Sequence, residues 1–183
     1  AEAGLQPAGE KGYLQPLQVT TGAVMGEDNR LAIHSPGEER SLRPGQDYAP
    51  INFSSSGTAS GQLVFAGYGI DAEEKSYDDY THLDVQGRIV VVLRYEPPSF
   101  SGGQGSRRYT RHANLISKAI NARNRGAVAV IIANGYREGS DSDKLIKFGS
   151  VSGPADAGIP MLQVKNDVVE RWLEGSGRSL RDL

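Results

Sequence analysis

Two short, uninterrupted apolar runs dominate the hydrophobic pattern of the chain. Ile89–Leu93 reads IVVVL and residues 127–133 read AVAVIIA. Strands of a parallel sheet are buried on both faces, so they lack the apolar–polar alternation of half-exposed strands. The pattern therefore predicts two buried strands. Pro97-Pro98 follows the first one, and proline cannot donate to a sheet ladder.

A helical period separates the two runs, in residues 112–125. Gly126 directly follows it and suits the C′ position of a helix. The strand–helix–strand order predicts a βαβ unit with a parallel pair of strands. The apolar stripe of this helix consists of Leu115, Ile116, Ala119, Ile120 and Ala122.

The remaining pattern is weaker and predicts short elements. We expect a second helix over Asn166–Leu173 and one helical turn over residues 76–83, whereas residues 35–45 (SPGEERSLRPG) look turn-like. The fold class is predicted to be α/β with α+β character: a mixed sheet or partly closed barrel with two flanking helices. Further short strands are expected over residues 17–25, 30–33, 47–53, 62–68 and 159–164.

Length and composition indicate one domain with additional segments at its ends. The chain has 183 residues, 38 % of them hydrophobic, and its first residue is Ala rather than Met. We expect a leader or linker over residues 1–16, a domain over 17–175 and a C-terminal linker over 176–183, cut from a longer protein. The longest apolar run is far shorter than the ~20 residues that span a bilayer. Cysteine is absent, which excludes disulfides, thiolate metal sites and a cysteine nucleophile.

Charge is distributed unevenly, although the net charge is only −2. This small negative charge argues against a general nucleic-acid binder. Residues 71–84 hold six acidic side chains and one lysine, whereas residues 97–137 hold seven basic side chains and no acidic one. Four residues near the glycine-rich stretch are candidates for contact with an anionic group, such as a peptide C-terminus or an acidic side chain: Arg107, Arg108, Tyr109 and Arg111. The alternative is a solvated loop that pairs loosely with the acidic segment.

A metal site could use the triplet His82-Leu83-Asp84. Zinc sites need three or four converging ligands, and this triplet supplies at most two. The chain has three histidines and no H-E-x-x-H motif. The alternative is that Asp78, Asp79 and Asp84 cap the helical turn and accept hydrogen bonds from nearby backbone N–H groups. Calcium could bind residues 71–79, which lack the spacing of an EF-hand loop.

Two further chemistries are disfavoured by spacing. GTASG and GSVSG carry serine at the fourth position, and neither lies between a strand and a helix as a nucleophile elbow does. The turn after IVVVL is RYEPPS, which is not a glycine-rich phosphate-binding loop.

Several blocks of the chain, in order, resemble one family. The blocks are GQLVFAGYGI, YDDYTHLDVQGRIVVVLRYEPP, RYTRHANLISKAINARNRGAVAVIIANG and GIPMLQVKNDVVERWL. They are similar to the protease-associated (PA) domain inserted in bacterial M28-family zinc aminopeptidases. The resemblance implies a swivelling β/β/α fold and a non-catalytic domain. It places zinc and the hydrolytic residues in a separate catalytic domain, in an extracellular, periplasmic or cell-envelope protein.

The same resemblance implies a role and partners. PA domains are thought to cover the active site or to help select substrates and partners. The expected partners are the catalytic domain of the same polypeptide and its peptide substrate, with no nucleic acid and no membrane. His82-Leu83-Asp84 then belongs to a domain signature, with Gly87 turning into the buried strand and Tyr77 and Tyr80 packing beneath it. The alternatives are a free-standing adaptor that binds proteins through an edge strand, and an enzyme with zinc at His82 and Asp84.

Overall fold

The computed structural model describes residues 24–35, 37–100, 109–136, 143–151, 153, 156–174 and 176–182. The expected leader over residues 1–16 lies outside these residues. So does most of the strand expected over 17–25, whose residues 24 and 25 belong to no strand.

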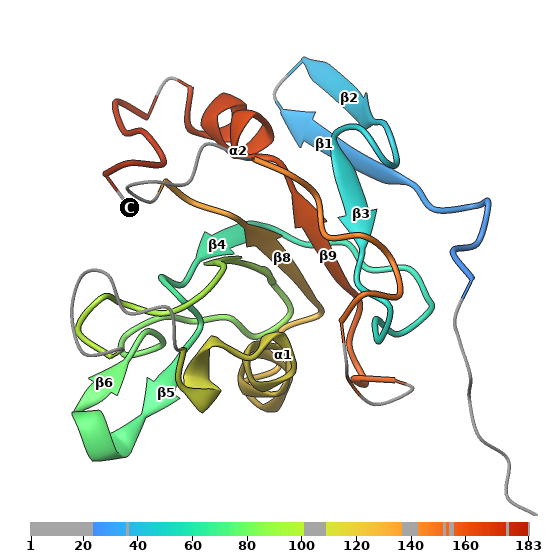
Figure 1. Ribbon diagram of the computed structural model, residues 1–183. Coiled ribbons are helices and arrows are strands. Elements are labelled where there is room, and N and C mark those ends of the chain that lie inside the picture. Colours follow the sequence, from blue (N-terminus) through green and yellow to red (C-terminus); the bar gives the residue numbers. More distant parts are fainter. Residues whose placement is uncertain are drawn as a thin grey trace, which may run out of the picture.

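A five-stranded mixed sheet forms the centre of the molecule (Figure 1). Its four parallel strands are β4 (Leu63–Phe65), β7 (Ile89–Leu93), β8 (Ala129–Ala133) and β9 (Met161–Val164), and the order is β3-β9-β8-β7-β4. The edge strand β3 (Tyr48–Pro50) runs antiparallel to β9. The predicted mixed sheet is thus confirmed, and so is the parallel pairing of the two apolar runs.

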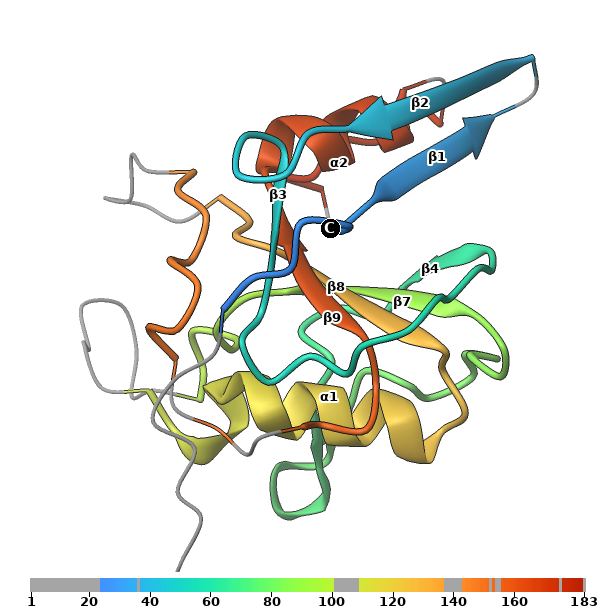
Figure 2. The ribbon, with the colours of Figure 1, turned by 90° about the vertical axis from the view of Figure 1, so that its right-hand side faces the viewer.

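The two helices lie on opposite faces of this sheet (Figure 2). They are α1 (Leu115–Asn124) and α2 (Asn166–Leu173). Helix α1 ends in a Schellman motif, because Gly126 N–H bonds to the carbonyl of Arg123 and Ala127 N–H bonds to that of Ala122. Gly126 has φ +81°, which favours glycine at this turn. The first two residues of the apolar run, 127 and 128, therefore lie between the helix end and the strand. Strand β8 begins two residues later than predicted.

Strand alternation divides the core into two layers. In β7, Val90 and Val92 face α1, while Val91 and Leu93 face α2. The neighbouring strand β8 repeats this division with its own aliphatic side chains. Burial on both faces explains why these two strands show no polar alternation in the sequence.

Two small hairpins differ from the sequence-based expectations. Residues 35–45, expected to be turn-like, contain β2 (Glu38–Leu42), which pairs with β1 (Leu31–Ser35). Most side chains of β2 are exposed to solvent, so a polar run is compatible with this strand. The expectation that this part of residues 35–45 is turn-like was therefore wrong.

The helical turn expected over residues 76–83 was also wrong. Strands β5 (Asp71–Ala72) and β6 (Tyr77–Asp78) form an antiparallel pair around the 3₁₀ turn Glu73–Lys75. Ser76 adopts the left-handed conformation at φ 50°, so the chain reverses there instead of continuing as a helix. Gly87, at φ +67°, makes the expected turn into β7, and Tyr80 is buried in the core.

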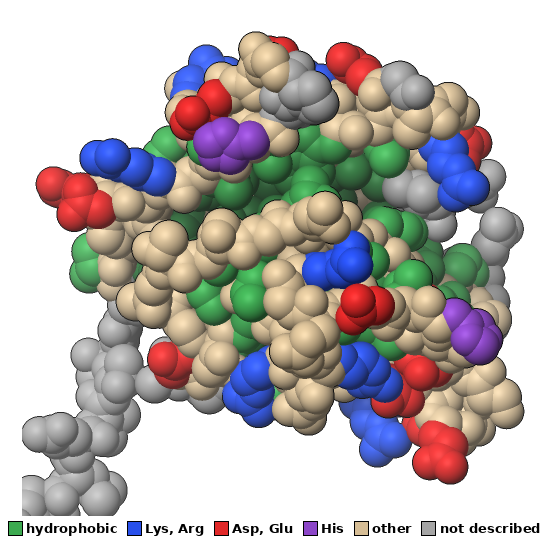
Figure 3. All heavy atoms as spheres, turned by 180° about the vertical axis from the view of Figure 1, so that it is seen from behind, with side chains coloured by type: hydrophobic (Ala, Val, Ile, Leu, Met, Phe, Trp, Pro, Cys, Tyr) green, Lys and Arg blue, Asp and Glu red, His purple; other side chains and the backbone are tan. Residues whose placement is uncertain are grey.

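A hollow lined by both apolar and charged side chains lies between the β1–β2 hairpin and the edge of the sheet (Figure 3). Its volume is about 390 Å³, and its walls include Ile33, Leu63 and Trp172. Within the described part of the chain, no helix has the length and apolar character needed to cross a bilayer.

Candidate functional site

Asp79 links three donors from neighbouring segments. Its Oδ2 accepts hydrogen bonds from the backbone N–H groups of Tyr68 and Ile70, both at 3.0 Å, and its Oδ1 accepts from the Tyr77 hydroxyl at 2.7 Å. Burial raises the pKa of Asp79, and these hydrogen bonds oppose the shift. This carboxylate fastens the end of β4 to the β5–β6 hairpin.

The other predicted capping aspartates also bind nearby backbone groups. Asp78 accepts from Tyr80 N–H at 2.8 Å and Asp84 accepts from Gln86 N–H at 3.1 Å. The expected hydrogen bonds to backbone N–H groups are therefore confirmed, although they stabilise a hairpin and loop rather than a helical turn.

The side chains of His82-Leu83-Asp84 are not arranged as a pair of metal ligands. His82 is exposed and has φ 65°. The exposed Asp84 carboxylate lies 3.4 Å from Arg88 Nη2. Among the residues described by the structure, no group of three or more His, Asp or Glu side chains is arranged to hold a metal ion.

Two carboxylates of residues 71–79, the segment considered for calcium, converge on an arginine. Asp71 and Asp78 lie 2.5 Å and 3.6 Å from Arg125 Nη2. The guanidinium also lies over the ring of Tyr80, at 4.5 Å from its centroid. Arg125 thus supplies positive charge to two of the clustered acids.

The described residues on either side of the glycine-rich stretch are held firmly. The buried Glu96 accepts hydrogen bonds from the Thr110 backbone N–H at 2.8 Å and from the Thr110 hydroxyl. Tyr109 stacks on Tyr95, with ring centroids 4.9 Å apart. Phe100 packs edge-on against Tyr77 at 5.1 Å. Both flanks of the stretch are therefore fixed to the domain.

Arg111 is paired with the acidic segment. Glu74 Oε1 lies 2.9 Å from Arg111 Nη2 and 2.9 Å from His112 Nε2. The backbone hydrogen bond of Glu74, together with His112 and Arg111, lowers the pKa of Glu74 to about 2. Two of the four candidate contact residues, Tyr109 and Arg111, are described by the structure, and each contacts another part of the domain. Arg107 and Arg108 lie outside the described residues. Arg111 thus makes the ion pair with the acidic segment that the alternative describes.

Lys118 is a functional candidate that the sequence analysis missed. Its side chain is fully buried and donates to the carbonyls of Tyr68 and Tyr95, at 2.5 Å and 2.6 Å. Burial lowers its pKa to about 8. The signal in the sequence is its spacing, since Lys118 lies three residues after Leu115 and four before Ala122, within the apolar stripe.

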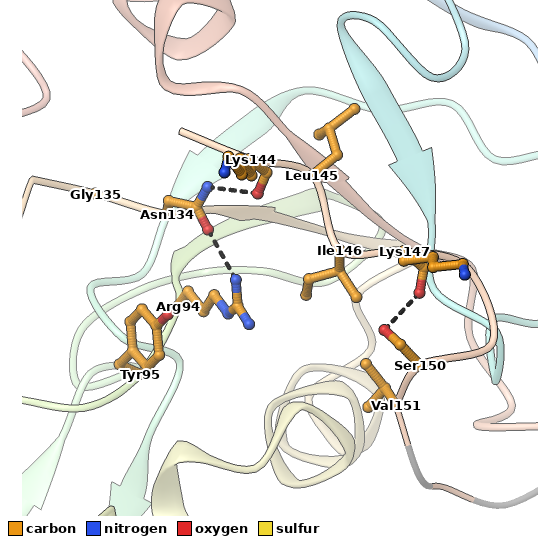
Figure 4. Close-up of a pocket in the computed structure, with 10 residues that line it drawn as sticks. All are labelled: Arg94, Tyr95, Asn134, Gly135, Lys144, Leu145, Ile146, Lys147, Ser150 and Val151. Atoms are coloured by element: carbon orange, nitrogen blue, oxygen red, sulfur yellow. Dashed lines mark hydrogen bonds between the residues drawn. The ribbon is translucent and has the colours of Figure 1, made fainter. Parts of the chain in front are cut away.

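A pocket of about 320 Å³ lies at the carboxyl ends of β7 and β8 (Figure 4). Arg94 and Tyr95 follow β7, and Asn134 and Gly135 follow β8. In open α/β sheets, ligands bind at the carboxyl ends of the strands. The other lining residues all belong to one later segment of the chain: Lys144, Leu145, Ile146, Lys147, Ser150 and Val151.

Buried amides hold this pocket in shape. Gln163 Nε2 donates to Asn134 Oδ1 at 2.8 Å, and Gln163 Oε1 accepts from Ile146 N–H at 2.6 Å. Asn166 brackets Gly135, because its side chain bonds to both the N–H and the carbonyl of that glycine, at 3.0 Å each. Polar residues that directly follow or interrupt buried parallel strands were the signal for this pocket in the sequence.

Comparison with known proteins connects these features to a family. The PA domain family matches residues 59–172, from shortly before β4 to near the end of α2. No curated protein matches the chain.

Two solved structures are similar to it over a minor part of their own length. An aminopeptidase from Aneurinibacillus sp. strain AM-1 has 18 % identity and a TM-score of 0.45, over 74 % of this chain and 26 % of that one. BSAP, a zinc aminopeptidase from Bacillus subtilis, has 24 % identity and a TM-score of 0.46, over 79 % of this chain and 30 % of that one. This chain therefore spans less than a third of either enzyme. The family match, in contrast, takes in more than half of the chain, which thus belongs to the PA domain family.

Proposed function

We propose that this chain is the non-catalytic PA domain of an M28-type zinc aminopeptidase, in which it covers the active site and assists substrate selection. The observation that carries the proposal is the PA family match over residues 59–172. The sequence blocks described above add the resemblance to the domain inserted in bacterial M28 aminopeptidases. In this proposal zinc and the hydrolytic residues belong to the catalytic domain of the parent protein, which acts outside the cytoplasm or in the cell envelope.

The proposed partners are the catalytic domain of the same polypeptide and the peptide substrate. We place the domain at residues 17–175, between linkers over 1–16 and 176–183. The contact element is the stretch over residues 99–112 with its candidates Arg107, Arg108, Tyr109 and Arg111. Two features support this assignment: its described flanks are anchored, Phe100 on Tyr77 and Thr110 on Glu96, and its candidates are mostly cationic.

The isolated chain is expected to lack aminopeptidase activity. Amino-acid amide substrates, incubated with the 183-residue chain with and without added zinc, should be hydrolysed no faster than in buffer. The full-length enzyme serves as the positive control in the same assay. Zinc-dependent turnover that disappears in His82→Ala would contradict the non-catalytic assignment.

Charge reversal in the proposed contact element should change substrate use. In the full-length enzyme, Arg108→Glu is expected to change KM for peptides by about threefold to tenfold, because one charge contact is worth about 1 kcal/mol. Zinc content and kcat for a small amide substrate should stay the same. The matched control is Arg40→Glu, an equal charge change on the exposed strand β2. Equal KM values across a peptide panel for Arg108→Glu and the unmodified enzyme would remove the contact element from the proposal.

A further inference from the structure

Arg94 carries a positive charge that no described carboxylate neutralises. None of the ion pairs between described residues includes Arg94. Among the described residues its guanidinium has one hydrogen-bond partner, with Nη1 donating to Asn134 Oδ1 at 3.3 Å. A guanidinium has five N–H donors, so most of its donors remain for a ligand. Figure 4 shows the side chain directed into the pocket between Asn134 and Ile146.

The position of this guanidinium is fixed by buried groups. Asn134 is 8 % exposed, and its amide nitrogen donates to Asp143 Oδ1 and to the carbonyl of Lys144, both at 3.1 Å. Its oxygen also accepts from Gln163, which is fully buried. On the other side, Arg94 lies over the ring of Tyr95, at 4.9 Å from its centroid. A guanidinium held in this way is preorganised, so it loses little conformational entropy when a ligand binds.

The described walls of the pocket carry basic side chains. Among the described residues that line it, Arg94, Lys144 and Lys147 are basic and none is acidic. The carboxylate of Asp143 is engaged by other donors: it accepts from the Asn134 amide and, at 2.7 Å, from the backbone N–H of Asn166 at the start of α2. A second hollow of about 260 Å³ shares Arg94 and Asn134 and adds Arg181. Arg94 is therefore shared by two hollows, each of which has at least one further basic residue among its described walls.

The apolar part of the wall indicates what kind of anion fits. Ile146 and Val151 line the same pocket as the guanidinium. A volume of about 320 Å³ is at the lower end of the range of ligand pockets, which suits one side chain or one terminal residue. Carboxylates match the planar fork of arginine, and the methylene or methyl groups that precede a carboxylate suit the apolar wall.

We propose that the Arg94 pocket, formed by Arg94, Asn134, Lys144, Ile146, Lys147 and Val151, binds a carboxylate of an extended peptide, either an acidic side chain or the C-terminus. The inference builds on the proposed function, because it names the peptide chemistry that a substrate-selecting domain would recognise. It is nevertheless testable on this chain alone, without the catalytic domain.

The test is to titrate the 183-residue chain with small probes. Calorimetry measures the affinity, and changes in the ¹⁵N amide chemical shifts show which residues are affected. Three acetylated alanine pentapeptides serve as probes: one with a central glutamate and an amidated end, one with a free C-terminus and no acidic side chain, and one with a central glutamine and an amidated end. Inorganic phosphate is the fourth probe. At least one carboxylate peptide is expected to bind tenfold or more tightly than the glutamine peptide, with shifts at Asn134 and Ile146. The tighter of the two carboxylate peptides identifies the source of the carboxylate.

Substitutions assign the binding to this pocket. Arg94→Gln should weaken the carboxylate peptide at least tenfold, and Arg94→Lys should weaken it less, because charge remains while the fork is lost. The control is Arg88→Gln, at the residue directly before β7 and so at the opposite end of this strand from Arg94. It should leave the affinity unchanged. If Arg94→Gln does not fold, the exposed pair Lys144→Gln and Lys147→Gln should still weaken binding about threefold to fivefold.

Two results would overturn the inference. One is equal affinity for the carboxylate and glutamine peptides, and the other is binding of phosphate in preference to both carboxylate peptides. Neither result bears on the non-catalytic role in a peptidase, which the aminopeptidase assay tests separately.

Discussion

Lys118→Met is expected to lower the free energy of unfolding by about 2–3 kcal/mol at pH 7. The ammonium group donates to the carbonyls of Tyr68 and Tyr95, at the ends of the segments that follow β4 and β7. Methionine fills a similar volume but donates no hydrogen bond, so both carbonyls lose this donor. A buried polar group without a partner costs about 1–3 kcal/mol, and removing a buried charge offsets part of that cost. Urea unfolding measures the difference.

A matched control separates burial from the chemistry of methionine. Asn124→Met places the same side chain at an exposed position of the same helix and should change stability by less than about 0.5 kcal/mol. Equal stability of Lys118→Met and the unmodified chain would contradict the structural role of the two hydrogen bonds.

The pH dependence of the same pair of proteins gives a second readout. Burial lowers the pKa of Lys118 from 10.5 to about 8. Between these values the unfolded chain still holds a proton that the folded chain has released, so stability rises with pH. From pH 8 to 9.5 the unmodified chain should gain about 1.5 kcal/mol relative to Lys118→Met. Tyrosine ionisation affects both proteins alike and cancels in the difference, and a constant difference across this range would rule out the lowered pKa.

The hydrophobic pattern of the sequence predicted the helices and strands whose side chains are all buried or are buried with a strict period. Ile89–Leu93 and Asn166–Leu173 have the bounds that the sequence indicated. The start of β8 was misplaced because Ala127 belongs to the Schellman motif, in which its N–H reaches back to Ala122. The β1–β2 and β5–β6 hairpins were missed because exposed two-stranded elements need no apolar alternation.

The polar sites could not be predicted because their partners are distant in sequence. Lys118 bonds to Tyr68, fifty residues earlier, and Gln163 bonds to Ile146, seventeen residues earlier. Periodicity describes which face of an element is buried and carries no information about such pairs. The charge pattern did anticipate one of them, since Arg111 of the basic segment pairs with Glu74 of the acidic segment.

Asp79→Ala is expected to cost about 3 kcal/mol, because it removes the acceptor of three hydrogen bonds at once. Hydrogen bonds to a carboxylate are stronger than those between neutral groups. Asp79→Asn keeps one acceptor oxygen and should cost about 1 kcal/mol. The control Asp84→Ala removes one exposed backbone contact, to Gln86, together with a surface ion pair to Arg88, and should cost less than about 1 kcal/mol. Thermal or urea unfolding ranks the three variants, and a loss for Asp84→Ala as large as that for Asp79→Ala would contradict the ranking.

Gly67 provides an independent check on the position of this carboxylate. A Cβ added at Gly67 would come within 2.2 Å of Asp79 Oδ1, and the residue has φ +46°. Gly67→Ala should therefore destabilise the chain through both a clash and backbone strain. In the Asp79→Ala background the clash partner is gone and only the strain remains, so the cost of Gly67→Ala should fall by about 1 kcal/mol or more. Strict additivity of the two substitutions would show that Asp79 does not occupy the space beside Gly67. Coupling would instead mean that this glycine and this carboxylate together hold the end of β4, from which Tyr68 reaches Lys118.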